Sequence, residues 1–395
     1  MTISIKNKQI QKAFYTILVL GFFFFLSGIL FFNSMSAYHT QIYIFLILPT
    51  LILVITKHNE LNNLWQSNSI HLLLLLFSFI LLSLLWNDTT VNDAKQIKKL
   101  LLIFTFILSL VYLHSYNNKI IIHILLLTSS IYAIAGLYSI FDLYILQDAP
   151  WNTRLIGFGN LSNPLLSSHI YGVFSIFIAA YYLNSEQKTV KSILLAFIFF
   201  SLLLFVLLTH SRTPLLGFAG TFALILLLQR SKKILYTAVI VILIAIVFIT
   251  LNFDELSSRG FSSRPELWSL TLEKIFQRPF LGYGIGSELL LYIESLDMSF
   301  SEPHNIHLGL SYSLGAIGLL IWLFFLTQLF IFFIKNKSIL LAQIAGLMLM
   351  YGLTSGLTEG SNIFTRPKEI WFLIWLPIAL LLAAENNYLK IIDKK

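Results

Sequence analysis

Long apolar runs dominate this chain and restrict it to folds that a lipid bilayer can surround. A helix needs about 20 apolar residues to cross a bilayer, with a range of about 17–25. Inside the bilayer every backbone polar group must be paired, so each run is expected to be helical. Only 11% of the residues are charged, against about 25% in soluble domains. Twelve runs qualify as spans: 14–32, 41–56, 70–86, 100–113 (with a backward extension into 92–99), 119–141, 166–183, 192–209, 213–229, 234–251, 305–334, 338–355 and 369–384. The sequence therefore predicts an all-α integral membrane protein with about 12 transmembrane helices.

The charges between the runs predict the orientation. The run that starts at Phe14 is too long for a signal-peptide core, so we expect a retained first span. With the N-terminus inside, 15 of the 26 Lys and Arg residues fall on the inside and 11 on the outside. This bias agrees with the positive-inside rule and places both termini in the cytoplasm. The net charge of +8 is explained by topology, so we expect membrane lipids and no nucleic acid as partners. The chain has no Cys, which excludes disulfides and thiol catalysis.

Arginine is distributed unevenly between the two sides. Of the seven Arg residues only Arg230 is predicted inside, and six are predicted outside: Arg154, Arg212, Arg259, Arg264, Arg278 and Arg366. The planar guanidinium grips phosphate through two parallel hydrogen bonds and stays charged. The outside set therefore indicates a phosphate-bearing ligand on that side. The alternative is that individual Arg side chains pair with lipid headgroups or nearby acids.

One predicted outside segment, Asn252–Pro303, is much longer than an ordinary loop, which favours a functional role. It divides the chain into residues 1–251 with nine spans, 252–304 as the loop with short amphipathic helices, and 305–395 with three spans and a short cytoplasmic tail. Within it, Ser263 and Glu266 have capping-box spacing, and Pro265 suits a first helical turn. The apolar face of this helix is predicted to lie on the membrane or against the bundle, and it comprises Trp268, Leu272, Ile275 and Phe276.

Two short segments hold residues suited to chemistry at the outer surface. Glu302–Asn305 opens the tenth span, and it includes His304, whose side chain type best accepts a proton near neutral pH. The alternative is a structural role at a helix start, and for His307, one turn along, packing is the preferred interpretation. Thr209–Pro214 forms a short outside turn with Arg212. The glycine run Gly282–Gly286 is interpreted as a tight turn, because no βαβ unit surrounds it.

These residues resemble the signatures of the O-antigen ligase and polymerase superfamily. His304–Asn305 followed by Gly315 and Gly318 resembles the family's His-Asn motif with its spaced glycine pair. Ser211–Arg212 resembles its Ser-Arg turn. Arg264 with Trp268 resembles the Arg of its large periplasmic loop, and Gly282–Gly286 resembles its glycine run. The resemblance covers the twelve-span layout and, in detail, about residues 205–320.

The resemblance implies an inverting, metal-independent glycosyltransferase in the bacterial inner membrane, with its active site facing the periplasm. Such enzymes move a glycan from undecaprenyl diphosphate to an acceptor and need no cofactor. His304 would be the base, and Arg212, Arg264 and Arg154 would hold the diphosphate, with Asn305 and His307 as possible support. Lipid A-core is the favoured acceptor because the chain is compact. An O-antigen polymerase and a protein O-oligosaccharyltransferase remain as alternatives.

Two further expectations concern electrostatics and competing functions. Nearby Arg cations should disfavour protonation of His304 and keep it available as a base. A lipid-linked glycan transporter would also explain twelve spans and an anionic ligand, but it gives the ordered loop and His304 no role. Metal-dependent membrane glycosyltransferases use acids in the first outside loop. The corresponding loop here, 33–40, has no Asp or Glu, so no metal site is expected.

Overall fold

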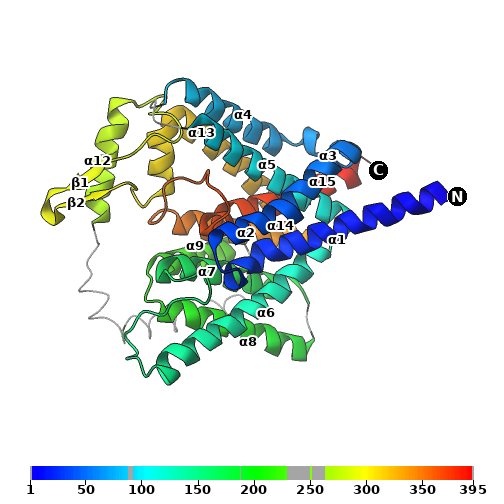
Figure 1. The fold of residues 1–395 in the computed structure, drawn as a ribbon, viewed down its shortest axis with the longest axis horizontal. Helices are drawn as coiled ribbons and strands as arrows, with labels where there is room; N and C mark the ends of the chain where they lie inside the picture. Colours follow the sequence, from blue (N-terminus) through cyan, green and yellow to red (C-terminus); the bar gives the residue numbers. More distant parts are fainter. Residues whose placement is uncertain (1, 88–91, 187, 229–249, 251–262, 394–395) are drawn as a thin grey trace.

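The computed structural model describes residues 2–87, 92–186, 188–228, 250 and 263–393. It is a bundle of helices with one small β-hairpin (Figure 1), so the mostly helical, multi-pass membrane architecture is confirmed. The helices are α1 Thr2–Phe31, α2 Met35–Ile42, α3 Leu48–Thr56, α4 Asn68–Leu82, α5 Asp93–Tyr116, α6 Ile120–Phe141, α7 Pro164–Asn184, α8 Thr189–Leu208, α9 Thr213–Leu228, α12 Arg264–Gln277, α13 Ile306–Lys335, α14 Leu340–Ser355 and α15 Leu376–Ile392. The strands are β1 Leu291–Ile293 and β2 Met298–Phe300.

The predicted spans correspond closely to these helices. In the described residues nine helical segments are long and apolar enough to cross a membrane, and α9 and α14 are shorter apolar helices. Short π-helical turns extend or join several of them, at Tyr43–Ile47, Asp142–Leu146 and Trp371–Trp375. The predicted backward extension of the fourth span is confirmed, because α5 starts at Asp93. The predicted span 234–251 lies outside the described residues except for Thr250, so the count of twelve stays a prediction.

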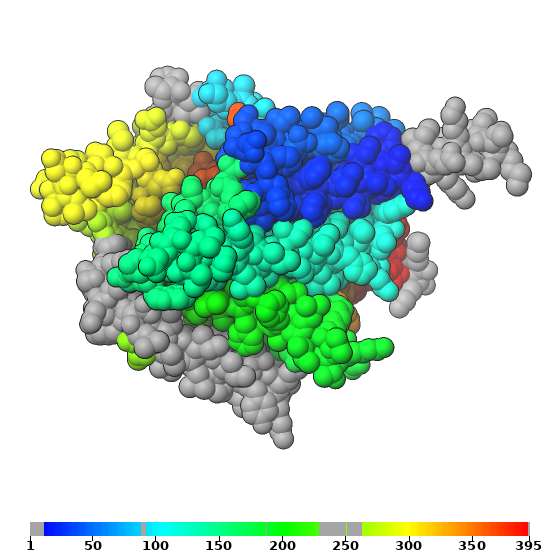
Figure 2. Space-filling view, turned by 60° about the horizontal axis from the view of Figure 1, so that its bottom comes forward, coloured from blue at the N-terminus to red at the C-terminus, as the bar shows by residue number. Residues whose placement is uncertain are grey.

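Different parts of the chain lie at the two ends of the bundle. The start of α1 and the end of α15 lie together at one end, and α12 with the β1–β2 hairpin lies at the other (Figure 1). Figure 2 shows the β1–β2 region, in yellow, projecting from its end of the molecule, while α1 to α3 and α6 cover most of that face. The last helices are interior, since residues 371–384 are all buried. The end with α12 is called the loop end below.

The long predicted loop packs as a small unit of its own at the loop end. Its described residues, 263–303, include α12 and the antiparallel hairpin, and neither strand was predicted. Leu267, Leu291 and Ile293 are buried together against Tyr312 of α13. The buried side of α12 is therefore Leu267 and Thr271.

The side of α12 that packs inside the protein is not the predicted apolar face, which was expected on the membrane or against the bundle. Trp268 and Ile275 are half-buried, but Leu272 and Phe276 are 41% and 76% exposed. The predicted capping box is also wrong, because the Ser263 side chain makes no capping hydrogen bond. The expected position of Pro265 in the first turn is confirmed. Contacts inside the loop unit bury Leu267 and Thr271, and a membrane-facing position for the predicted apolar face stays a prediction.

Candidate functional site

The carboxylate of Glu359 contacts two of the predicted site residues, His304 and Arg264, at the loop end. It lies in the segment between α14 and the π-helical turn at Trp371, called the 356–370 segment here. His304 Nδ1 lies 3.2 Å from Glu359 Oε1, and Arg264 Nη2 lies 3.4 Å from Glu359 Oε2. The Glu359 side chain is 12% exposed, and those of His304 and Arg264 are 33% and 22% exposed. His304 and Arg264 thus flank one shielded carboxylate.

The backbone around His304 explains why an Asn follows it. Asn305 Oδ1 accepts from the N–H groups of His307 and Leu308 and so caps α13. The Asn305 amide donates to Leu357 O at 3.0 Å, and Ile306 N donates to Gly356 O at 2.9 Å. These bonds join the start of α13 to the 356–370 segment. His304 itself has φ +49°, a strained conformation that concentrates at functional sites.

Arg264 is positioned by the first turns of α12. Trp268 Nε1, one turn further on, donates to Pro303 O at 3.0 Å. Pro303 directly precedes His304, so this bond holds α12 against the residue pair that starts α13. The resemblance of Arg264 and Trp268 to the family's loop motif thereby gains a physical basis. Trp268 fixes the helix, and the helix presents Arg264 to Glu359.

The glycine run is not an isolated tight turn, which corrects that interpretation. It fits into a break in α13, where Gly315 has φ +62° and ψ −168°. Tyr283 N and Gly284 N donate to Tyr312 O and Ser313 O at 2.9 and 2.8 Å, and Ala316 N donates back to Pro279 O at 2.8 Å. A Cβ on Gly315 would lie 2.3 Å from Phe280 O. The run and the Gly315 break therefore form one backbone joint between the loop and α13.

The turn at 209–213 brings Arg154 and Arg212 toward the same segment. The predicted short turn between two helices is confirmed, since α8 ends at Leu208 and α9 starts at Thr213. Arg154 Nε donates to Thr209 O at 2.9 Å, and its Nη2 donates to Ser211 Oγ at 3.1 Å. Thr358 Oγ1 donates to Thr213 Oγ1 at 3.3 Å, next to Glu359. Arg154 therefore braces the turn that carries the half-buried Arg212.

The pKa of His304 is shifted in the opposite direction from the expected one. The hydrogen bond to Glu359 raises the pKa of His304, and this outweighs the lowering effects of burial and of Arg264. The expectation that Arg cations would dominate was wrong, because the intervening carboxylate lies closer. For Glu359, burial acts to raise the pKa, but the hydrogen bond and the charge of His304 outweigh it, so that the pKa is lowered.

The hydrogen bond also fixes the tautomer of His304. An ionised carboxylate can only accept, so His304 Nδ1 must hold the proton that it donates to Glu359 Oε1. The neutral ring then has its lone pair on Nε2, where a substrate proton can be taken up. The same logic operates in acid–base triads, in which a buried carboxylate orients a histidine base.

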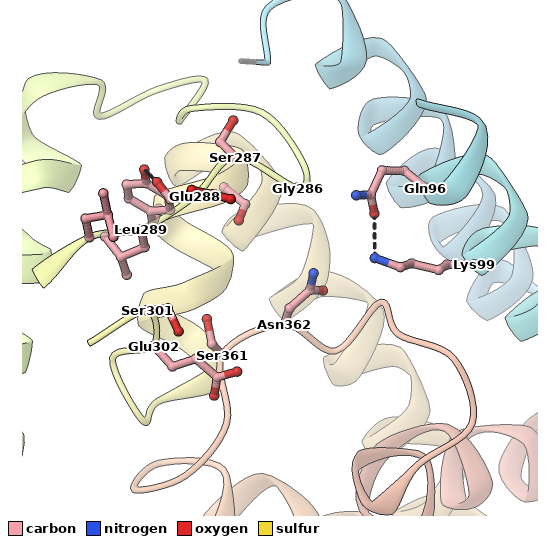
Figure 3. A pocket seen from close by; sticks show the side chains of 13 residues that line it. Gln96, Lys99, Gly286, Ser287, Glu288, Leu289, Ser301, Glu302, Ser361 and Asn362 are labelled. Atoms are coloured by element: carbon pink, nitrogen blue, oxygen red, sulfur yellow. Dashed lines mark hydrogen bonds between the residues drawn. The ribbon is translucent and has the colours of Figure 1, made fainter. Parts of the chain in front are cut away.

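Two neighbouring cavities open beside this site. One, of about 220 Å³, is lined by Glu359, Glu302, Lys368 and the buried His169 among others. The other, of about 390 Å³, is lined by Gln96, Lys99, Ser287, Glu288, Ser301 and others, and Figure 3 shows it between α5 and the loop. Glu302, Ser361 and Asn362 line both. Polar walls of this kind can hydrogen-bond a sugar.

The remaining predicted residues are less involved. His307 is half-buried in α13, and among the residues that the structure describes its side chain forms no hydrogen bond or ion pair with Glu359 or His304. The Arg278 guanidinium lies 4.7 Å from the centre of the Tyr283 ring. Arg259 lies outside the described residues. In the part of the chain that the structure describes, no group of three His, Asp or Glu side chains could hold a metal ion.

Sequence reasoning missed Glu359. An acid between the last two predicted spans, followed by Gly360, was the available signal, but no spacing rule connects it to a histidine 55 positions earlier. The 356–370 segment as a whole was overlooked for the same reason.

Comparisons with known proteins agree with this geometry. A family model described as O-antigen ligase matches residues 195–323, which include Arg212, Arg264, His304 and Gly315. An O-antigen ligase from Pseudomonas aeruginosa is 33% identical over 373 residues, which cover 93% of this chain and 90% of the relative. A ComP-specific O-oligosaccharyltransferase from Acinetobacter baylyi is 26% identical over 295 residues, 68% of this chain and 49% of that protein. With a shared third of its residues across almost its whole length, the chain belongs to the O-antigen ligase family.

Proposed function

We propose that this protein is an inverting, metal-independent glycosyltransferase of the bacterial inner membrane. It moves an O-antigen glycan from undecaprenyl diphosphate to lipid A-core at the periplasmic surface. The observation that carries the proposal is the His304–Glu359–Arg264 arrangement, in which a base with a fixed tautomer lies beside a cation. Membership of the O-antigen ligase family supports the choice of reaction.

The proposed reaction is a single displacement at the anomeric carbon of the donor. A hydroxyl oxygen of lipid A-core attacks that carbon while its proton moves to Nε2 of His304. The bond between the carbon and the diphosphate oxygen breaks, and the diphosphate leaves with the bonding electron pair. Glu359 holds His304 in place and stabilises the imidazolium that forms. Attack from the side opposite the leaving group inverts the anomeric centre.

The arginines supply the electrostatic part of the proposal. The diphosphate gains negative charge as it leaves, and fixed cations stabilise that charge in the transition state. Arg264 and Arg212 are proposed to contact the diphosphate. Arg154 was predicted as a third contact, but its bonds to Thr209 and Ser211 favour a bracing role for the Arg212 turn.

A protein O-oligosaccharyltransferase is the second candidate, favoured by the similarity to the Acinetobacter baylyi protein. An O-antigen polymerase would use the same site with another carrier-linked repeat as acceptor. Deleting the gene separates these three. Lipid A-core without O-chain, with carrier-linked polymer accumulating, supports the ligase. Capping with a single repeat supports a polymerase, and an unglycosylated protein acceptor supports the oligosaccharyltransferase.

The base is tested directly with purified protein, undecaprenyl diphosphate-linked glycan and lipid A-core. General-base catalysis contributes about 10²–10⁴-fold, so His304→Ala should lose about that much single-turnover rate. Donor binding should stay largely intact, because the arginines supply it. His307→Ala is the matched control on the next turn and should be milder. Transfer by His304→Ala at the wild-type rate would eliminate the proposed mechanism.

A further inference from the structure

Five cations lie at the loop end, three of them on α5 and two in the 356–370 segment. This basic cluster comprises Lys95, Lys98 and Lys99 of α5 with Arg366 and Lys368. The Lys99 ammonium interacts electrostatically with Lys95, Arg366 and Lys368, and all three interactions are repulsive. Within the described residues only Lys368 of the five forms an ion pair, with Glu369 at 3.4 Å. Like charges held together in this way favour the binding of a polyvalent anion.

The position of the cluster is not explained by membrane topology. The first turns of α5 lie at the loop end, because Asn87 donates to Asp93 at the start of α5 and the neighbouring Trp86 donates to Leu281 O next to the glycine run. Cations that set orientation accumulate on the cytoplasmic side, where the termini are predicted. Lys95, Lys98 and Lys99 lie at the opposite end, so their concentration there needs a different reason.

The basic cluster borders the larger cavity. Gln96 and Lys99 extend from α5 into it, with Lys99 Nζ donating to Gln96 Oε1 at 2.9 Å, and they face Asn362 across the space (Figure 3). Ser301, Glu302 and Ser361 add hydroxyl and carboxylate groups to the opposite wall. Amide, hydroxyl and carboxylate groups are suited to bind sugar hydroxyls, and the ammonium is suited to bind phosphate.

The larger cavity lies next to the smaller one, which reaches Glu359, the partner of His304. Glu302, Ser361 and Asn362 line both cavities, and the smaller one extends to Glu359. A sugar chain bound in the larger cavity can therefore present a hydroxyl toward His304 while its phosphate stays beside Lys99.

We propose that the basic cluster and the adjoining cavity bind the acceptor through phosphate groups on its sugars, so that the acceptor is a phosphorylated glycolipid. This inference rests on the proposed function. In an inverting displacement the acceptor and the leaving diphosphate lie on opposite sides of the anomeric carbon. The diphosphate belongs beside Arg264, which contacts Glu359. Lys99 of the cluster lines the larger cavity, which Arg264 does not line, so the cluster is left for the acceptor.

The test compares acceptor and donor in one set of variants. Lys99→Gln/Arg366→Gln removes two cluster charges, and Lys274→Gln/Lys335→Gln removes two cations elsewhere as the control. The proteins are placed in neutral phosphatidylcholine nanodiscs. Binding of lipid A-core and of enzymatically dephosphorylated lipid A-core is measured without donor, and transfer is then measured with donor. Charge-assisted bonds to phosphate are strong enough for a loss of about ten-fold or more.

The expected result is an acceptor Kd and KM raised about ten-fold or more in the cluster variant alone, with donor KM and kcat within about two-fold of wild type. Dephosphorylated acceptor should bind both proteins equally weakly. The inference is overturned if acceptor affinity is unchanged, or if donor KM rises instead. It is also overturned if phosphatidylglycerol competes as well as lipid A-core, since the cluster would then bind lipid headgroups. Absence of transfer to any acceptor, with phosphate-dependent binding intact, would contradict the proposed function and leave this site standing.

Discussion

His304 holds a left-handed backbone conformation, with φ +49°, at the residue where the loop meets α13. A non-glycine residue in this region costs of order 1–3 kcal/mol, which the surrounding bonds must offset. Asn305 and Ile306 supply such bonds by pairing with Leu357 and Gly356 of the 356–370 segment. In this backbone conformation the imidazole of His304 lies within hydrogen-bonding distance of Glu359. Sequence could identify His304 because its motif is local, but Glu359 becomes its neighbour only through the tertiary fold.

The pH profile tests the pairing of His304 with Glu359. Catalysis needs the neutral imidazole, so kcat/KM should rise as the pH increases through the pKa of His304. Glu359 raises that pKa, so Glu359→Gln should lower it and move the acidic limb of the profile to lower pH. The plateau should fall about 10²-fold or more, because the tautomer is no longer fixed. Rate measurements across pH 5 to 9 decide this, and an unshifted acidic limb would show that Glu359 does not control the base.

Arginine geometry gives a second prediction at this scale. Arg→Lys keeps the charge but loses the planar fork that binds a diphosphate through paired bonds. Arg264→Lys and Arg212→Lys should each lose most transfer activity while still being expressed and inserted. Lys274→Arg, on the exposed side of α12, is the control and should behave as wild type. Near-normal transfer by both Arg→Lys variants would leave these cations a topological role only.

At the scale of elements, the joint between the glycine run and α13 determines where α12 lies. The break at Gly315 frees the carbonyl groups of Tyr312 and Ser313, and the loop uses them in place of the next helical turn. The sequence predicted α13 from its long apolar run and singled out Gly315 and Gly318 as a spaced glycine pair. The pairing partner could not be predicted, because glycine runs occur in tight turns and in backbone contacts alike.

Substituting Gly315 tests the joint. Gly315→Ala places a Cβ 2.3 Å from Phe280 O at a positive φ, and the backbone strain alone costs about 1–3 kcal/mol. We expect a lower thermal midpoint in detergent and reduced transfer, because α12 shifts and moves Arg264 from Glu359. Leu323→Ala, at a 41% exposed position of the same helix, should leave both quantities near wild type. Wild-type stability and transfer in Gly315→Ala would contradict the joint.

At the scale of the whole molecule, the lengths of the apolar runs predicted most of the bundle. Spans are long and strongly apolar, and eleven of the predicted ones coincide with helices that the structure describes. The sequence was less informative about the length and continuity of α13. α13 has 30 residues but is broken at Gly315, and the part after the break, 316–335, is about 30 Å long at 1.5 Å per residue, which matches a hydrocarbon core of about 30 Å. The part before Gly315 can therefore extend beyond the core and hold His304 at the surface.

The orientation of the bundle gives the last prediction. The inside Lys bias places both termini in the cytoplasm and residues 252–303 in the periplasm, and the termini lie at the end opposite α12 (Figure 1). Because the chain has no Cys, single cysteines can be introduced without removing any. Cysteines at Ser299 of β2 and at Ser257, which lies outside the described residues, should react with an impermeant thiol reagent in intact spheroplasts. Lys335→Cys at the end of α13 should react only after the membrane is permeabilised. Labelling of Lys335→Cys in intact spheroplasts, with protection of both serine positions, would reverse the topology and place His304 on the cytoplasmic side.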